Sequence, residues 1–191
     1  MAGVPASEIK EIICPFFIVS TISSLTFFSG YDCDSLAFEK ITNFAEHSLD
    51  FFANHPEAEL EFRTKSVNVQ TLLDRKPLPN CVVAFSLSPE KVEAALDFKA
   101  PSVKKRIAAI QKLAKSGWLV GLRLDPMIFC ENWKTQYSGL IADVMDNLEI
   151  ANLHSVSFGP LRYPKKMYNR IAGLYPEEKL FAFPMTTNEQ T

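Results

Sequence analysis

The sequence predicts an α/β protein built around a parallel sheet of five or six strands. Short apolar segments rich in β-branched and aromatic residues alternate with longer segments whose apolar residues recur at helical spacing. Strands that alternate with helices form parallel sheets with right-handed crossovers. The chain is also large enough for one sizeable core, with 191 residues and 47% hydrophobic content. The order of elements fits either a partial barrel or an open doubly wound sheet.

The first predicted strand, Leu25–Ser29, leads through a turn into an amphipathic helix at Asp34–Ala53. Apolar residues recur along this helix at helical spacing, Asp34 is a favourable N-cap residue, and Pro56 follows the helix end. Ala58–Arg63 is the second strand, and Val67–Leu73 is a short helix.

The third strand, Cys81–Ser86, is a dense apolar segment of the kind that helices cover on both faces. Ser88 is the predicted cap of the next helix, with Pro89 at its first position. A further helix begins near Ser102, buries one apolar stripe and ends at Gly117.

The last part of the chain continues the alternation of strands and helices. Trp118–Asp125 is the fourth strand, and Trp133–Leu148 shows a clear helical face. Leu153–Phe158 is the fifth strand, and Lys165–Leu174 is the last helix. Lys179–Phe181 is the candidate for a final strand.

Residues 1–24 form an atypical or altered N-terminal segment. Ile12–Val19 is strongly apolar, so a signal peptide is the rival interpretation. The acidic residues Glu8 and Glu11 precede it in place of a positive region, and polar residues and a proline interrupt the apolar stretch. We therefore expect no membrane segment, and a single α/β domain at residues 25–191.

The charge and cysteine content exclude several classes of protein. The net charge of −2 gives no overall attraction to nucleic acid. The cysteines form no CxxC pair, so neither a zinc site nor a disulfide framework is predicted, and a cytoplasmic location is expected. The histidines show no metal-ligand spacing, so we predict no metal ligands in this chain.

Polar residues stand where three of the predicted strands end. Lys65 follows the second strand, Ser86 ends the third and Asp125 ends the fourth. The carboxyl ends of parallel strands meet at one edge of a sheet, where α/β proteins place active sites. A lysine ammonium at this edge suits a ligand carboxylate. We expect these three side chains to converge there.

Several segments resemble the spore photoproduct lyase family of radical S-adenosylmethionine (radical SAM) proteins. The segments that carry the resemblance are Leu25–Glu39, Glu59–Lys65, Val82–Ser88 and Gly121–Trp133. Gly121–Ile128, with the sequence GLRLDPMI, is close to the family's G-x-R-x-D-P-I strand. The resemblance covers about Leu25 to Leu180 and implies a partial (β/α)6 barrel. It also implies S-adenosylmethionine and a [4Fe-4S] cluster as cofactors, and repair of a thymine dimer in DNA.

The resemblance assigns roles to particular side chains. Those implied to bind S-adenosylmethionine are Lys65 and Ser86, and those implied to line the substrate side are Tyr31, Cys33, Asp34 and Asp125. The repair lyases carry a hydrogen-donating cysteine in the turn after the first strand. This chain has Tyr31 at that place and Cys33 two residues later, so the lyase reaction itself stays open.

Purely structural roles are the alternative for most of these residues. Asp34 can simply cap its helix, and Lys65 can be a surface lysine after a strand. Arg123 alternates with apolar neighbours, so its charge needs a partner if it points inward. Asp125 is the expected partner, and a structural Arg123–Asp125 pair competes with a catalytic role for Asp125.

The cysteine motif that holds the family's cluster is missing from this sequence. No CxxxCxxC occurs, and Cys14 and Cys33 lie too far apart to replace it. We therefore expect no cluster on this chain alone, and a radical SAM-like barrel truncated at the front. A non-catalytic α/β remnant or binding module is the alternative function.

Two basic clusters and the sheet edge suggest partners. Lys104–Arg106 lies at a helix start and is expected to be solvated. Arg162–Lys166, together with Arg170, includes an interleaved tyrosine and suits DNA phosphates. If front strands are absent, a partner chain is expected to cover the exposed sheet edge.

Overall fold

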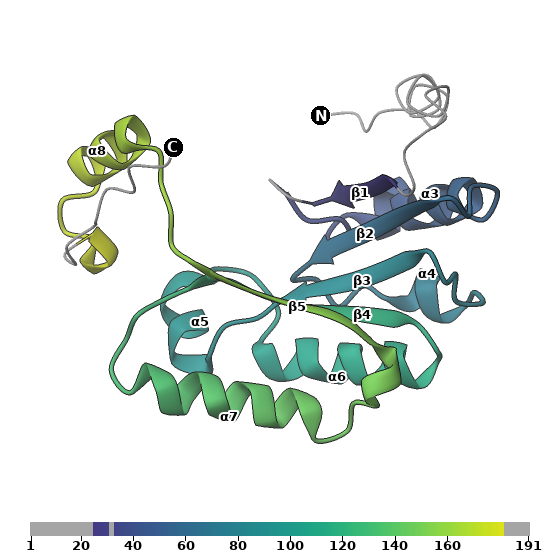
Figure 1. The fold of residues 1–191 in the computed structure, drawn as a ribbon. Coiled ribbons are helices and arrows are strands. Elements are labelled where there is room, and N and C mark those ends of the chain that lie inside the picture. The colour runs from purple at the N-terminus through teal and green to yellow at the C-terminus, as the bar shows by residue number, and fades with distance from the viewer. Residues whose placement is uncertain (1–24, 31–32, 182–191) are drawn as a thin grey trace.

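The computed structural model describes residues 25–30 and 33–181. Its centre is one sheet of five parallel strands in the order β1-β2-β3-β4-β5. The strands are β1 Leu25–Ser29, β2 Ala58–Thr64, β3 Cys81–Ser86, β4 Leu119–Met127 and β5 Leu153–Pro160. The sheet curls into a half-barrel (Figure 1). The predicted parallel sheet and the partial barrel are therefore confirmed.

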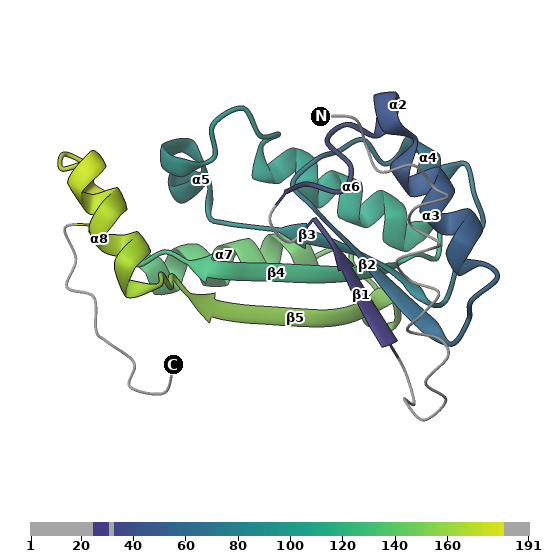
Figure 2. The ribbon, with the colours of Figure 1, turned by 90° about the horizontal axis from the view of Figure 1, so that it is seen from above.

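The helices lie between successive strands or after the last one. They are α2 Glu39–Thr42, α3 Phe44–Phe52, α4 Gln70–Leu73, α5 Glu90–Leu96, α6 Val103–Lys115, α7 Trp133–Met145 and α8 Lys165–Leu174. Two short 3-10 helices, η2 and η3, cover Ile150–Asn152 and Lys179–Phe181. Helix α8 lies beyond the carboxyl end of β5, away from the layer formed by α6 and α7 (Figures 1 and 2).

The hydrophobic core lies between the helices and one face of the sheet. Alternate residues of the central strands point into it, such as Phe62 of β2 and Phe85 of β3. Trp118 is fully buried just before β4, and its indole Nε1–H donates to the carbonyl of Leu72 at 3.0 Å. This bond satisfies the one polar atom of a large buried ring, as such rings require.

The predicted helix at Asp34–Ala53 is wrong in its extent, because the chain forms two shorter helices there. Asn43 lies between α2 and α3 with φ of 50°, a left-handed conformation that asparagine tolerates. The buried Glu39 carboxylate then accepts a hydrogen bond from the Ala45 backbone N–H at 2.8 Å. A side chain from the first helix thus satisfies a free N–H at the start of the second.

Two further expectations are corrected. Ser88 does not cap α5, whose N-cap is Pro89 and which has no side-chain cap hydrogen bond. Lys179–Phe181 is a 3-10 helix rather than a strand. The Phe181 ring of this segment packs on Tyr168 of α8 at a centroid distance of 5.7 Å.

Both outer strands of the described sheet, β1 and β5, are edges. Phe28 of β1 and Phe158 of β5 are 58% and 59% exposed. The expectations for residues 1–24 lie outside the described residues. Among the residues that the structure describes, no helix has the length and apolar character that crossing a membrane requires.

Candidate functional site

The sheet face opposite the helices, called the open face here, is lined largely by polar side chains. On β2 the residues that alternate with the core positions are Glu59, Glu61 and Arg63. Arg123 of β4 and Ser155 of β5 lie on the same face. Apolar residues cover the helix side of these strands, so the sequence alternation gives the half-barrel an apolar outside and a polar inside.

Three of the predicted site residues, Lys65, Ser86 and Asp125, lie at the carboxyl ends of adjacent strands. The parallel register pairs Thr64 with Phe85 and Ser86 with Arg123. Lys65 directly follows β2, Ser86 ends β3, and Asp125 lies near the end of β4. The structure thus brings these residues to one end of the sheet, the end where βα folds bind ligands.

Lys65 is held at both its backbone and its side chain. Its backbone N–H donates to Asp34 Oδ2 at 2.7 Å, and its ammonium pairs with the Asp97 carboxylate. The Lys65 side chain is still 41% exposed. A partly exposed, oriented ammonium at this end of the sheet suits a ligand carboxylate.

Asp34 fastens the turn after β1 to the end of β2. Oδ1 accepts hydrogen bonds from the backbone N–H groups of Leu36 at 2.9 Å and Ala37 at 2.8 Å, and from the Thr64 hydroxyl at 2.7 Å. With the Lys65 N–H on Oδ2, the carboxylate accepts four hydrogen bonds. This geometry supports a structural role, and a catalytic role for Asp34 stays a prediction.

The other predicted residues of this turn are less defined by their contacts. Tyr31 lies outside the described residues. Cys33 is exposed and belongs to the segment that Asp34 holds in place. A thiol accessible beside the carboxyl ends of the strands is compatible with the substrate-facing position predicted for Cys33.

The charge of Arg123 is paired with Glu61, which corrects the expected pairing with Asp125. Arg123 Nε donates to Glu61 Oε1 at 3.0 Å, and Nη2 donates to the other carboxylate oxygen. Arg63 Nε also donates to Glu61 Oε1, at 3.3 Å. Burial would raise the pKa of Glu61, but the hydrogen bonds and charges of both arginines outweigh it and hold that pKa below its ordinary value.

Asp125 instead meets residues of β5 and the segment after it. Arg162 Nη2 lies 3.4 Å from Asp125 Oδ2 in an exposed pair. A Cβ on Gly159 would lie 2.6 Å from the Asp125 carboxylate, so glycine makes room for this carboxylate at the end of the sheet. The Asp125 side chain is 31% exposed and remains accessible to a ligand.

Arg106 is the residue that the sequence interpretation missed. It was expected to be solvated with Lys104 and Lys105, but it is fully buried beneath the carboxyl end of β3. The sequence does indicate this burial, because Arg106 falls on the same buried stripe of the helix as Val103 and Ile110. A charged residue within a buried stripe indicates a paired interior charge.

The described cysteines do not fit an iron–sulfur cluster. Cys33 is exposed, while Cys81 is buried in the core, where burial and the nearby Glu59 charge raise its pKa to about 12. Three cysteine thiolates are needed on one cluster to leave an iron open. In the described part of the chain, no three His, Cys, Asp or Glu side chains are grouped so as to hold a metal.

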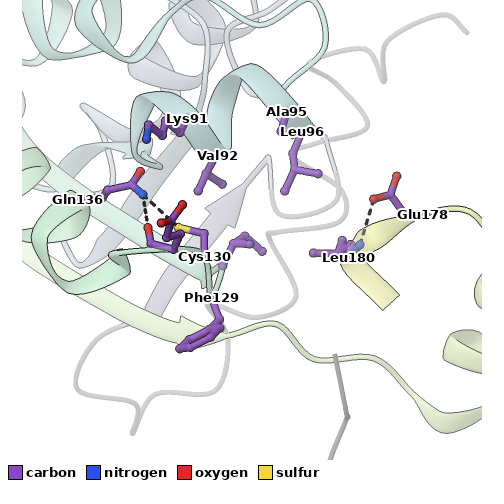
Figure 3. A pocket seen from close by; sticks show the side chains of 11 residues that line it. Lys91, Val92, Ala95, Leu96, Phe129, Cys130, Gln136, Glu178 and Leu180 are labelled. Atoms are coloured by element: carbon purple, nitrogen blue, oxygen red, sulfur yellow. Dashed lines mark hydrogen bonds between the residues drawn. The ribbon is translucent and has the colours of Figure 1, made fainter. Parts of the chain in front are cut away.

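A separate apolar hollow of about 270 Å³ lies between α5 and the segment that follows β4 (Figure 3). Val92, Leu96 and Cys130 are among its lining residues, and Gln136 Nε2 donates to Cys130 Sγ at 3.6 Å. None of the residues predicted at the cofactor lines this hollow.

Comparisons with known proteins agree with the fold. The model of the spore photoproduct lyase family matches residues 18–188. The spore photoproduct lyase of Clostridium acetobutylicum is 23% identical over 147 residues, which cover 77% of this chain and 44% of that protein. The Bacillus subtilis enzyme is 26% identical over 149 residues, with the same coverage of 77% and 44%. The chain thus spans about half the length of the curated relatives that it matches.

Solved structures of spore photoproduct lyase share the fold. A variant with bound AdoMet and dinucleoside spore photoproduct gives a TM-score of 0.79 at 22% identity, covering 91% of this chain and 52% of that one. The enzyme complexed with dinucleoside spore photoproduct gives the same values of 0.79, 22%, 91% and 52%. The family match over residues 18–188 and the shared half-barrel lead to one conclusion: the chain belongs to the spore photoproduct lyase family.

Proposed function

We propose that this chain provides the S-adenosylmethionine-binding and substrate-facing part of a radical SAM barrel of the spore photoproduct lyase type. One observation carries the proposal. In a half-barrel of this family, Lys65, Ser86 and Asp125 lie at the carboxyl ends of three adjacent strands. The open face behind them is polar and preorganised by the Glu61–Arg123 pair.

The proposed roles follow from the chemistry of each side chain. The Lys65 ammonium binds the carboxylate of S-adenosylmethionine, and Ser86 lies beside it on β3. S-adenosylmethionine together with a reduced [4Fe-4S] cluster would supply the radical chemistry of the family, while the protein would supply position and exclude water. Asp125 is proposed to face the substrate, and so are the turn residues Tyr31, Cys33 and Asp34.

The proposed substrate is a thymine photoproduct in DNA. Support comes from the structural neighbour that contains a dinucleoside spore photoproduct. Arg162 and Tyr163 follow β5 at the same end of the sheet as Asp125, and Arg162 is exposed. An exposed guanidinium beside the proposed site suits a phosphate of a nucleic-acid substrate. A cytoplasmic location agrees with this proposal, since DNA and reduced thiols occur there.

Replacing Lys65 with alanine should weaken binding of S-adenosylmethionine by about ten- to a hundred-fold. The lost contact is a charge-assisted hydrogen bond, which contributes roughly 1.5–3 kcal/mol. Isothermal titration calorimetry on the wild type and Lys65→Ala measures the difference. 5′-Methylthioadenosine, which lacks the carboxylate, should bind both proteins equally.

The matched control for this experiment is Lys115→Ala, which removes an exposed lysine from the last turn of α6. Its affinity for S-adenosylmethionine should equal that of the wild type. Equal affinity in wild type and Lys65→Ala would remove Lys65 from the proposed site.

A non-catalytic α/β binding module is the second candidate function, because the donors among the described residues do not fit a cluster. Anaerobic reconstitution with iron and sulfide should therefore leave this chain without a stoichiometric [4Fe-4S] cluster. Iron analysis and visible absorbance measure the result. A stoichiometric cluster that disappears in Cys14→Ala or Cys33→Ala would contradict the prediction and favour a catalytic chain.

The proposal also includes strands from a partner chain beside the described sheet. The described strands β1 and β5 are both edges, and each carries a phenylalanine that is more than half exposed. Exposed edges with large apolar side chains favour pairing with further strands.

A further inference from the structure

Arg106 is a buried cation with several polar partners at the carboxyl end of β3. Its side chain is fully inaccessible to solvent. Nη1 donates to the Ser86 carbonyl at 3.0 Å, and Nε donates to the Pro101 carbonyl at 2.8 Å. Nη2 donates to Asp97 Oδ2 at 2.8 Å and to Glu93 Oε1 at 3.3 Å. The guanidinium is thus fixed in position by groups from β3, α5 and the segment before α6.

Asp97 connects this buried guanidinium to Lys65. Its Oδ2 accepts from Arg106, and its Oδ1 accepts from the Lys65 ammonium. Burial would raise the pKa of Asp97, but hydrogen bonds and charges from Lys65 and Arg106 outweigh it and hold that pKa below its ordinary value. Asp97 therefore carries a negative charge at neutral pH.

Solvent exposure of the side chains increases from Arg106 through Asp97 to Lys65, towards the carboxyl ends of the strands. The Arg106 side chain is 0% exposed, that of Asp97 is 10% exposed, and that of Lys65 is 41% exposed. The most exposed member of this cluster is therefore the Lys65 ammonium, which lies at the carboxyl ends of the strands. Arg106 also holds the Ser86 carbonyl, so it contacts one residue predicted at the cofactor and reaches the other through Asp97.

We propose that Asp97 and Arg106 are positioning residues that hold the Lys65 ammonium ready for a ligand carboxylate. The inference rests on the function proposed above, in which Lys65 binds S-adenosylmethionine. A free lysine loses much rotamer freedom when it binds a ligand. A lysine already held by Asp97 loses less, and only one of its three N–H donors is engaged with that carboxylate.

Asp97→Asn should weaken binding of S-adenosylmethionine by about two- to ten-fold, the effect expected from releasing one long side chain. The effect should vanish in the Lys65→Ala background, because Asp97 acts through Lys65. Glu90→Gln is the matched control, since it also removes one negative charge. Glu90 lies on α5, like Glu93, and forms an exposed pair with Lys104. It should bind like the wild type. Circular dichroism and urea unfolding verify that each variant is folded.

A second measurement follows the Lys65 side chain without any ligand. After reductive ¹³C-methylation, the Lys65 methyl signal, assigned with Lys65→Arg, should be displaced from those of solvated lysines in the wild type. Asp97→Asn should move it to the solvated position, and Glu90→Gln should leave it unchanged. An unmoved signal in Asp97→Asn would overturn the positioning role.

The binding results distinguish failure of this inference from failure of the proposed function. If Lys65→Ala weakens binding but Asp97→Asn does not, the positioning role alone is wrong. If Asp97→Asn weakens binding equally with and without Lys65, Asp97 is structural only, and the inference again fails. If the wild type binds no S-adenosylmethionine, or if Lys65→Ala binds as tightly, the proposed function and this inference fall together.

Discussion

Replacing Arg123 with methionine should lower the free energy of unfolding by about 3 kcal/mol. The Glu61 carboxylate is only 4% exposed, and its bidentate partner would be gone. Breaking a buried ion pair by removing one partner typically costs about 3–5 kcal/mol. We expect a loss near the lower end of this range, because Arg63 Nε remains 3.3 Å from Glu61 Oε1 and still neutralises part of its charge. Urea unfolding followed by circular dichroism measures the change.

Arg162→Met is the matched control, because Arg162 forms an exposed pair with Asp125 at 3.4 Å. Its loss should change the free energy of unfolding by less than about 1 kcal/mol. Adding Glu61→Leu to Arg123→Met should restore part of the lost stability, since no unpaired charge then stays buried. A loss below about 1 kcal/mol for Arg123→Met would show that the pair contributes little to folding.

The Arg123–Glu61 ion pair also predicts how the free energy of unfolding depends on pH. The pKa of Glu61 in the folded wild type lies below its ordinary value of 4.5. The ionised Glu61 carboxylate therefore contributes its full share to the free energy of unfolding above the pKa that Glu61 has in the unfolded chain. This contribution is lost as the pH falls through the pKa of Glu61 in the folded protein. In Arg123→Met the hydrogen bonds and charge of Arg123 are gone, so the pKa of Glu61 rises above its wild-type value and protonation relieves part of the cost of the buried carboxylate. The stability gap between the two proteins should narrow from about pH 7 to about pH 4.

The sheet could be predicted from the sequence because its signals are local. Two strands, Leu25–Ser29 and Cys81–Ser86, have the predicted bounds, and so does the helix Lys165–Leu174. Apolar runs between turn residues are visible in a single sequence. The break at Asn43 was not visible, because it depends on Glu39 folding back to the Ala45 N–H.

The charge partners at the site were harder to predict, since they depend on register between strands. Arg123 was expected to pair with Asp125, two residues away on the same strand. Its partner, Glu61, lies on β2, two strands away in the sheet order. Gly121 on β4 leaves space for the guanidinium, because a Cβ there would lie 2.9 Å from Arg123 Nη2, and periodicity cannot reveal this close approach. Arg106 shows the same limit, because its helical position predicts burial but not its partners Asp97 and Glu93.

Replacing Gly30 with alanine should destabilise the fold by about 2–5 kcal/mol and displace the turn that carries Cys33 and Asp34. Gly30 has φ of +77°, a conformation that costs other residues about 1–2 kcal/mol. Its Cβ would also overlap the Arg63 carbonyl oxygen and lie 2.9 Å from the Ser35 backbone nitrogen. Crowding of this kind adds about 1–3 kcal/mol. Urea unfolding measures the stability.

Hydrogen exchange at the Ser35 amide reports the turn itself, because this N–H donates to the Arg63 carbonyl at 3.1 Å. Its protection should fall in Gly30→Ala more than that of amides in the central strands. Gly139→Ala is the matched control, since a Cβ there has no neighbour within 4 Å. Within helix α7 this change should be neutral or stabilise by up to about 1 kcal/mol. The opposite outcome is that Gly30→Ala and Gly139→Ala give the same free energy of unfolding and the same protection of the Ser35 amide. That result would show that close contact between Gly30 and the end of β2 does not hold Cys33 and Asp34 in place.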